Sequence, residues 1–269
     1  MNQLKPPFGW VGGKSKLADE IISLFPSHRL YVEVFAGALN ILYKKRPPQS
    51  SKQAEIVNDI NVELINLHRV IKMNPQSLSA YLNELLISRN LFNNIRDGKL
   101  KPRNKLERAA FYYYLIAQSF GSKGDNFAMQ AKTSRPRDIY RGFTIWSRRL
   151  KFVTVENMSF EKLISEYNQD DAFFYCDPPY FGTEDYYKNT GGFGIEEHIA
   201  LRDSLVEAKG KFLVSYNDHP FIRDLYKDYR IKQSKEIDYT LGANVHERKK
   251  KVSEIYIMNY QEEGLFSFH

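Results

Sequence analysis

Four consecutive residues combine a carboxylate, two rigid residues and an aromatic ring: Asp177, Pro178, Pro179 and Tyr180. The apolar run 172–175 before them predicts a buried strand. The prolines end that strand because proline fixes φ and has no N–H to donate to a sheet. Asp-Pro-Pro alone can form an ordinary turn, but a turn requires neither the tyrosine nor the apolar strand before it. We therefore expect a ligand-binding or catalytic site at this strand tip.

Two more strand tips carry residues suited to a ligand. The stretch "LYVEVFAG" predicts a strand that ends in Gly37, where backbone can pass close to a bound molecule. Asp59 ends the next predicted strand about 20 residues on, the spacing at which an acid accepts hydrogen bonds from a ribose. A nucleoside-like ligand beyond these tips can present its reactive end to Asp177. Two simpler interpretations stay open: Gly37 as a turn residue, and Asp59 as the N-cap of a helix that begins at Asn61.

Alternating strands and helices must position these tips. Apolar residues follow helical spacing from about 61 to 119, whereas the stretch 120–143 is polar, basic and without periodicity. A short helix is expected just before the strand that leads to Asp177. The predicted strands are 30–37, 54–61, 150–158, 172–175, 209–218, 229–240 and 252–260. This order indicates an α/β sheet with an insertion in the middle of the chain.

Composition narrows the class of protein. A length of 269 residues suits one large domain or a domain with an insertion. The single cysteine, Cys176, excludes a disulfide framework and a cysteine-based zinc cage, and it favours a reducing compartment. No secretion signal or membrane-length apolar run is visible, so we expect a soluble intracellular protein. The net charge of +7 makes a polyanionic partner plausible.

Four stretches occur in an order that resembles the DNA adenine N6-methyltransferase (Dam) family: "FGWVGGKSKL", "YVEVFAGALN", "IVNDIN" and "FFYCDPPY". The resemblance is to the group with a target-recognition insertion between the cofactor motif and Asp-Pro-Pro-Tyr, and it covers nearly the whole chain. "FLVSYND" and the final hairpin with Arg248 also correspond. The chain departs from the family at Leu39, where a second glycine is common, and in the insertion, which only loosely follows the family's recognition hairpin.

The resemblance implies the Rossmann-like α/β fold of S-adenosylmethionine-dependent methyltransferases, a seven-stranded sheet with an antiparallel last strand. It implies a catalytic domain of residues 1–62 and 145–269, and an inserted, mostly helical DNA-recognition domain of residues 63–144. The implied enzyme is a site-specific, adenine-specific DNA methyltransferase, bacterial or phage-encoded, that acts on double-stranded DNA in the cytoplasm. The sequence does not establish its oligomeric state, for which a monomer is our expectation. GATC is the family's commonest target and the expected one. A restriction partner, a housekeeping role and a phage role all stay open.

The resemblance also implies S-adenosylmethionine as the cofactor and no metal. Carried over by position, Trp10 and Lys14 line the methionine end of the cofactor, and Asp59 holds the ribose hydroxyls. Phe160 falls where the family contacts the cofactor's adenine, although plain core packing is an equal alternative. The full expected cofactor set is Trp10, Lys14, Phe35, Ala36, Gly37, Asp59, Phe160 and Asp177.

The chemistry implied for the motif concerns the exocyclic nitrogen of adenine, which is a poor nucleophile because its lone pair is delocalised into the ring. The Asp177 carboxylate and the Pro178 carbonyl can each accept one of its two N–H bonds, which favours a pyramidal nitrogen with a free lone pair. Rigid prolines keep these acceptors fixed, so little reorganisation is needed. Tyr180 can stack on the base, which must first leave the duplex.

Basic residues interleaved with aromatics suit phosphate contacts and wedging into a base stack. In the insertion they alternate with Phe127, Tyr140 and Phe143, although a solvated charged face is the commoner reason for such runs. Edge-strand protection is an alternative for the basic hairpin loop that contains Arg248. The expected DNA-binding residues are Phe120, Lys123, Lys132, Arg135, Arg137, Arg141 and Arg248.

Rival functions have weaker support. "GWVGGKS" is not a phosphate-binding P-loop, because Gly9 and Gly13 are too close and no strand precedes them. A methyltransferase for RNA adenine or protein glutamine remains an alternative, although such families tend to carry Asn before the prolines. The histidines are scattered without metal-ligand spacing, and a capping or surface role is expected for His219.

Overall fold

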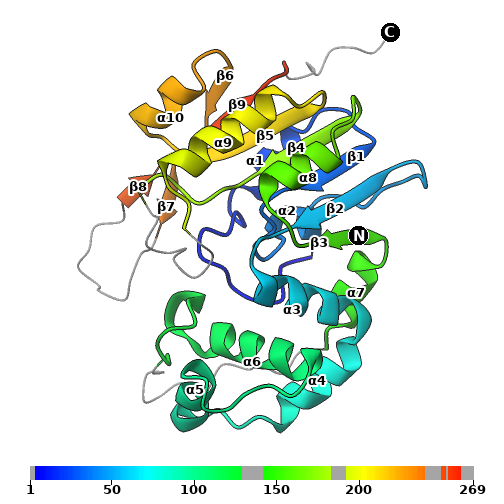
Figure 1. Ribbon diagram of the computed structural model, residues 1–269, viewed down its shortest axis with the longest axis vertical. Coiled ribbons are helices and arrows are strands. Elements are labelled where there is room, and N and C mark those ends of the chain that lie inside the picture. Colours follow the sequence, from blue (N-terminus) through cyan, green and yellow to red (C-terminus); the bar gives the residue numbers. More distant parts are fainter. Residues whose placement is uncertain (1–3, 129–141, 183–191, 240–249, 253, 262–269) are drawn as a thin grey trace. The chain divides into compact units, whose positions relative to one another are not determined.

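The computed structural model describes residues 4–128, 142–182, 192–239, 250–252 and 254–261 (Figure 1). Within these residues, seven strands form one sheet in the order β3-β2-β1-β4-β5-β9-β6. Strand β9 runs antiparallel to β5 and to β6, whereas β1 is parallel to β2 and to β4, and β4 is parallel to β5. The predicted α/β sheet with an antiparallel last strand is therefore confirmed. The strands are β1 (Leu30–Glu33), β2 (Ala54–Asn58), β3 (Val153–Glu156), β4 (Ala172–Cys176), β5 (Lys211–Asn217), β6 (Arg230–Gln233) and β9 (Glu254–Met258), with β7 (Ile237–Tyr239) and β8 (Lys250–Val252) paired separately.

The central strands end at one edge of the sheet. In β1, Glu33 pairs with Val57 of β2 and with Tyr175 of β4, so the three strands are in step. The register continues past β1, where the Val34 N–H donates to the Tyr175 carbonyl at 2.9 Å. Strands β1 and β4 are buried along their whole length, which explains their nearly continuous apolar sequences. The three sequence motifs therefore leave the sheet from neighbouring strand tips.

The described helices are α1 (Ala18–Ser23), α2 (Asn40–Lys44), α3 (Val62–Met73), α4 (Pro75–Glu84), α5 (Arg89–Arg96), α6 (Lys105–Gln118), α7 (Thr144–Leu150), α8 (Phe160–Glu166), α9 (Ile195–Val206) and α10 (Pro220–Leu225), with a 3-10 turn at Phe120–Ser122. Side-chain caps explain several starts. Asn61 caps α3 by accepting from the Glu63 and Leu64 N–H groups, so the interpretation of Asp59 as the N-cap is wrong.

The backbone divides into two compact units. Unit 1 comprises Met1–Ser15, Ala36–Pro47 and Asp59–Asn157, and unit 2 comprises Lys16–Phe35, Pro48–Asn58 and Met158–His269. The predicted insertion 63–144 lies within unit 1, together with two earlier segments of the chain. None of the helices in the described ranges has both the length and the apolar character that a membrane span requires.

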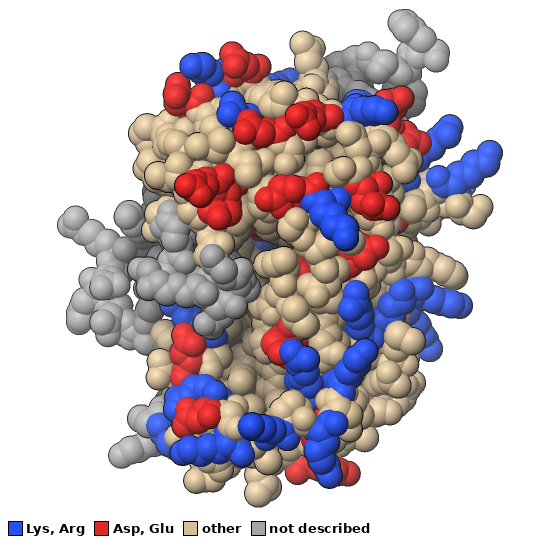
Figure 2. Space-filling view, in the orientation of Figure 1, with Lys and Arg blue, Asp and Glu red and all other residues tan. Residues whose placement is uncertain are grey.

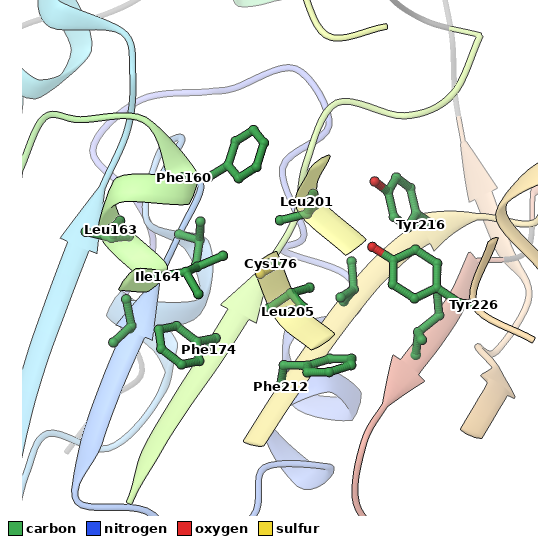
Figure 3. Packing of buried hydrophobic residues seen from close by; sticks show 14 of the residues in the cluster. Phe160, Leu163, Ile164, Phe174, Cys176, Leu201, Leu205, Phe212, Tyr216 and Tyr226 are labelled. Atoms are coloured by element: carbon green, nitrogen blue, oxygen red, sulfur yellow. The ribbon is translucent and has the colours of Figure 1, made fainter. Parts of the chain in front are cut away.

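The core of unit 2 packs α8 and α9 on one face of the sheet (Figure 3). Side chains of α8 and α9 meet Phe174 of β4 and Phe212 of β5, which face each other across the strands. Cys176 belongs to this cluster, and burial raises the pKa of its thiol far above the usual range. The cysteine is therefore a packing residue that stays protonated.

The core of unit 1 anchors the N-terminal segment. Trp146 donates its indole N–H to the Lys5 carbonyl at 2.7 Å, and the Tyr113 hydroxyl donates to the Pro7 carbonyl at 3.3 Å. Phe143 lies between these aromatics, with ring centroids 5.3 Å from Tyr113 and 5.9 Å from Trp146. Since Phe143 is fully buried, the expectation that it wedges into DNA is wrong.

Candidate active site

In unit 2, the tip of β4 presents Asp177 as a half-buried carboxylate. The Ser215 hydroxyl on β5 donates a hydrogen bond to Asp177 Oδ1 at 3.1 Å. Pro178 is buried and Tyr180 is half-buried, with its ring centroid 6.5 Å from that of Tyr216. Burial, together with the charge of Asp177, raises the pKa of the adjacent Tyr175 well above its usual value. A carboxylate therefore lies beside neutral, protonated neighbours.

The chain after Tyr180 is held by the end of β5 and the start of α10. Asn217 donates from Nδ2 to the Phe181 carbonyl at 3.1 Å. The Phe181 ring stacks on Phe221, with centroids 4.7 Å apart and planes inclined by 28°. His219 caps α10, because its Nδ1 accepts from the Phe221 N–H at 3.2 Å, which confirms the capping role expected for it.

An aromatic trio lies after β1 within unit 2. Phe35 is half-buried and its ring centroid is 5.9 Å from Phe160 and 5.7 Å from Phe193. Phe160, at the start of α8, is only 9% exposed and belongs to the core (Figure 3). Core packing thus accounts for Phe160, and its contact with a cofactor stays a prediction.

In unit 1, Gly37 is fixed from three sides. Its N–H donates to Asp59 Oδ2 at 3.1 Å, and its carbonyl accepts from His68 Nε2 at 2.8 Å. Its φ of +49° is in the left-handed region, and a Cβ here would lie 3.0 Å from the Trp10 indole. Glycine is therefore required by both conformation and space.

Asp59 holds backbone N–H groups with both carboxylate oxygens. Oδ1 accepts from the Asn61 N–H at 2.9 Å, while Oδ2 accepts from Gly37. Burial raises the pKa of Asp59 above its usual value, although hydrogen bonds from Asn61 and Gly37 oppose this shift. The Ile60 N–H also bonds to this carboxylate, which leaves about one of its four lone pairs to accept a hydrogen bond from a hydroxyl group of a ligand.

The segment after Trp10 turns sharply toward α2. The Gly13 N–H donates to the Trp10 carbonyl at 3.2 Å, and a Cβ on Gly13 would lie 2.8 Å from Asn40 Nδ2. Lys14 follows as a buried cation, with Nζ 3.4 Å from the Gly12 carbonyl. In unit 1, Gly37 therefore lies against the Trp10 indole and bonds to Asp59, and Lys14 contacts the backbone that follows Trp10.

Of the expected DNA-binding residues, the structure describes Phe120 and Lys123. Both lie in an exposed loop, in which Ser119 Oγ accepts from the Gly124 N–H at 2.8 Å and Phe120 is 55% exposed. Figure 2 shows further Lys and Arg side chains over the helices of unit 1. Some are paired with acids, such as Arg103 with Glu107 at 2.8 Å. Outside the described residues lie Lys132, Arg135, Arg137, Arg141 and Arg248.

Four polar residues at these tips have roles that the sequence interpretation did not assign: Asn58, His68, Ser215 and Asn217. Asn58 Nδ2 donates to the Val34 and Met158 carbonyls, both at 3.1 Å. A signal for β5 was present, because a serine and an asparagine two residues apart at the end of an apolar strand share one face. No such signal exists for His68, whose partner lies in a distant loop.

Comparison with known proteins decides between the open functions. The family model of the D12 class N6 adenine-specific DNA methyltransferases matches residues 10–239. The chain belongs to this family. D12 class enzymes use S-adenosylmethionine as the methyl donor, and their substrate is DNA. The family assignment confirms adenine N6 in DNA as the substrate, against the alternatives of RNA adenine and protein glutamine.

Relatives of this D12 methyltransferase include bacterial and phage enzymes. A type II methyltransferase of Lactococcus lactis subsp. cremoris is 30% identical over 96% of both chains. A DNA adenine methylase of Haemophilus influenzae is 27% identical over 93% of this chain and 92% of its own. A DNA N-6-adenine-methyltransferase of Escherichia phage P1 is 26% identical over 82% of this chain and 31% of its own.

Proposed function

We propose that Asp177, Pro178, Pro179 and Tyr180 form the catalytic tip that acts on a flipped adenine in double-stranded DNA. The observation that carries this proposal is the shared edge of the sheet, where the tips of β1, β2 and β4 end in step. The Asp177 carboxylate and the Pro178 carbonyl accept the two N–H bonds of the adenine amino group. Its lone pair is thereby freed from the ring, and Tyr180 stacks on the base.

The second part of the proposal concerns the methyl donor. Supporting it are the remaining lone pair of the Asp59 carboxylate, which suits a ribose hydroxyl, and the absence of space for a side chain at Gly37. S-adenosylmethionine supplies an electrophilic methyl group when bound. We assign it to Trp10, Lys14, Phe35, Ala36, Gly37, Asp59, Phe160 and Asp177.

The third part concerns DNA. In this proposal the basic residues bind DNA phosphates, and the exposed ring of Phe120 helps to open the base stack. The basic residues are Lys123, Lys132, Arg135, Arg137, Arg141 and Arg248. The proposed target is GATC, and residues 63–144 form the recognition domain. Sequencing DNA from cells that express the protein, by a method sensitive to N6-methyladenine, tests the target directly. Methylation at another sequence would replace GATC without altering the catalytic assignment.

Substitution of Asp177 tests the catalytic tip. Asp177→Ala should lower methyl transfer in a single turnover by about 10²-fold or more, because one acceptor of the amino group is removed. Binding of S-adenosylmethionine, measured by calorimetry, should stay within a few-fold of wild type. Asp171→Ala is the matched control, since Asp171 is exposed just before the same strand and its carbonyl, not its side chain, accepts from Arg29. Wild-type turnover in Asp177→Ala would refute the assignment.

A further inference from the structure

Two polar side chains of β5 contact the segment 177–181. Ser215 and Asn217 are two residues apart and therefore point to the same face of the sheet. Ser215 contacts the side chain of Asp177, and Asn217 contacts the main chain of Phe181. The two contacts lie on either side of Pro178, Pro179 and Tyr180. Strand β5 thus holds the proposed catalytic tip at both of its ends.

The hydrogen bond from Ser215 has a defined direction. A serine hydroxyl has one proton, and an ionised carboxylate can only accept, so Ser215 must donate to Asp177 Oδ1. The Tyr175 hydroxyl lies 3.5 Å from Ser215 Oγ, and its raised pKa keeps it protonated and able to donate. Ser215 is fully buried, so water does not compete for its proton. The donor is therefore committed to the Asp177 carboxylate.

Asn217 fixes the other end of the tip. Its Nδ2 donates to the Phe181 carbonyl, and within the described part of the chain its buried Oδ1 has no hydrogen-bond partner. A buried acceptor without a partner costs stability. Packing alone therefore does not explain why an asparagine occupies position 217. The hydrogen bond to the Phe181 carbonyl does explain it.

We propose that Ser215 and Asn217 are positioning residues for methyl transfer. Ser215 sets the rotation of the Asp177 carboxylate, so that an oxygen faces the amino group of the base, and Asn217 fixes the main chain that follows Tyr180. The inference rests on the proposed catalytic role of Asp177. Errors of about 1 Å in such positioning can lower rates by roughly 10²-fold, so the effect is on the chemical step.

The test compares single-turnover methylation with cofactor affinity. Ser215→Ala should slow methyl transfer by about 10-fold or more, with the dissociation constants of S-adenosylmethionine and duplex DNA within about twofold of wild type. Ser215→Thr, which restores the hydroxyl, should recover most of the rate. Ser234→Ala is the matched control, because Ser234 is also a buried serine of unit 2 but bonds to Glu254 and Lys235. Its methyl-transfer rate should match wild type.

A second variant tests the other contact. Asn217→Asp keeps the size of the side chain but removes the donor to Phe181, and it should show the same separation of rate from cofactor affinity. Wild-type rates in both Ser215→Ala and Asn217→Asp, beside an inactive Asp177→Ala, would overturn this inference alone. An active Asp177→Ala would instead overturn the proposed function on which it rests.

Discussion

Gly37 shows how much one residue without a side chain contributes to this molecule. Its N–H, its carbonyl and the space above its Cα are each occupied by a different neighbour: Asp59, His68 and Trp10. A side chain at position 37 must therefore displace the Trp10 indole or the backbone of Gly37, both of which belong to the proposed binding site of the methyl donor.

Gly37→Ala should weaken binding of S-adenosylmethionine roughly tenfold, which corresponds to about 1.4 kcal/mol. The added Cβ pushes against the Trp10 indole and also strains a positive φ. Gly98→Ala separates these effects, since Gly98 has a φ of +67° and nothing within 4 Å of an added Cβ. It should lose only about 1 kcal/mol of stability, with unchanged binding. Calorimetry and urea unfolding measure both quantities, and equal binding by the two variants would contradict the role of Trp10.

His68 makes the stability of unit 1 depend on pH. Burial lowers its pKa to about 4, although the hydrogen bond to Gly37 opposes this shift. The unfolded chain binds a proton near pH 6.5, whereas the folded protein does not until about pH 4. The free energy of unfolding should therefore fall by a few kcal/mol as pH decreases from 6.5 to 4, since each pKa unit is worth about 1.4 kcal/mol. Urea unfolding at several pH values measures this dependence.

His68→Gln is the variant that isolates this effect. Glutamine can still donate to the Gly37 carbonyl but does not titrate, so its stability should change less over the same pH range. An identical pH dependence in both proteins would assign the effect to groups other than His68. Asp59 would not be one of them, because its raised pKa acts in the opposite direction.

At the scale of elements, α2 begins under strain. Its N-cap residue Leu39 has φ +61° and ψ 40°, the left-handed conformation that glycine adopts readily. This is the position where the family often carries glycine, and the side chain of Leu39 is fully buried. Packing of the leucine thus offsets an unfavourable backbone.

Two glycine substitutions in α2 test this balance. Leu39→Gly and Leu42→Gly both remove a fully buried leucine. Leu39→Gly also relieves a left-handed residue, whereas Leu42→Gly places glycine inside a helix, and each backbone effect is worth about 1 kcal/mol. Leu42→Gly should therefore be more destabilising by about 2 kcal/mol. Equal losses in chemical denaturation would show that Leu39 is not strained.

The sequence predicted those structural elements that are determined by the pattern of their own residues. The apolar runs of β1 and β4 predicted the strands, and the motifs at their tips predicted the family. The prediction of helical spacing from about 61 to 119 was incomplete, because it did not show the break between α4 and α5, where Ser88 caps α5. The contact between Ser215 and Asp177 depends on the pairing of β4 with β5, which local sequence does not encode. Phe143 was misjudged because neighbouring basic residues resemble an exposed loop.

At the scale of the whole molecule, the net charge of +7 points to DNA phosphates, and its contribution can be measured. Alanine at both Arg135 and Arg137 should reduce the slope of log affinity against log salt by about one for each phosphate that the variant no longer binds. Arg223→Ala is the control, because Arg223 is paired with Asp218 at 2.5 Å in unit 2. Its slope should equal that of wild type. An unchanged slope in the double variant would mean that Arg135 and Arg137 are solvent-exposed charges that do not contact DNA phosphates.

The burial of Cys176 gives the protein an internal reporter. It is the chain's sole cysteine, it lies in the middle of the sheet, and it directly precedes Asp177. A thiol reagent can modify it only when β4 opens, so the labelling rate reads out local unfolding next to the proposed catalytic residue. Because Cys176 reacts slowly in the folded protein, a cysteine introduced on the surface would be the only thiol that reacts quickly. It could therefore be labelled selectively with a fluorophore.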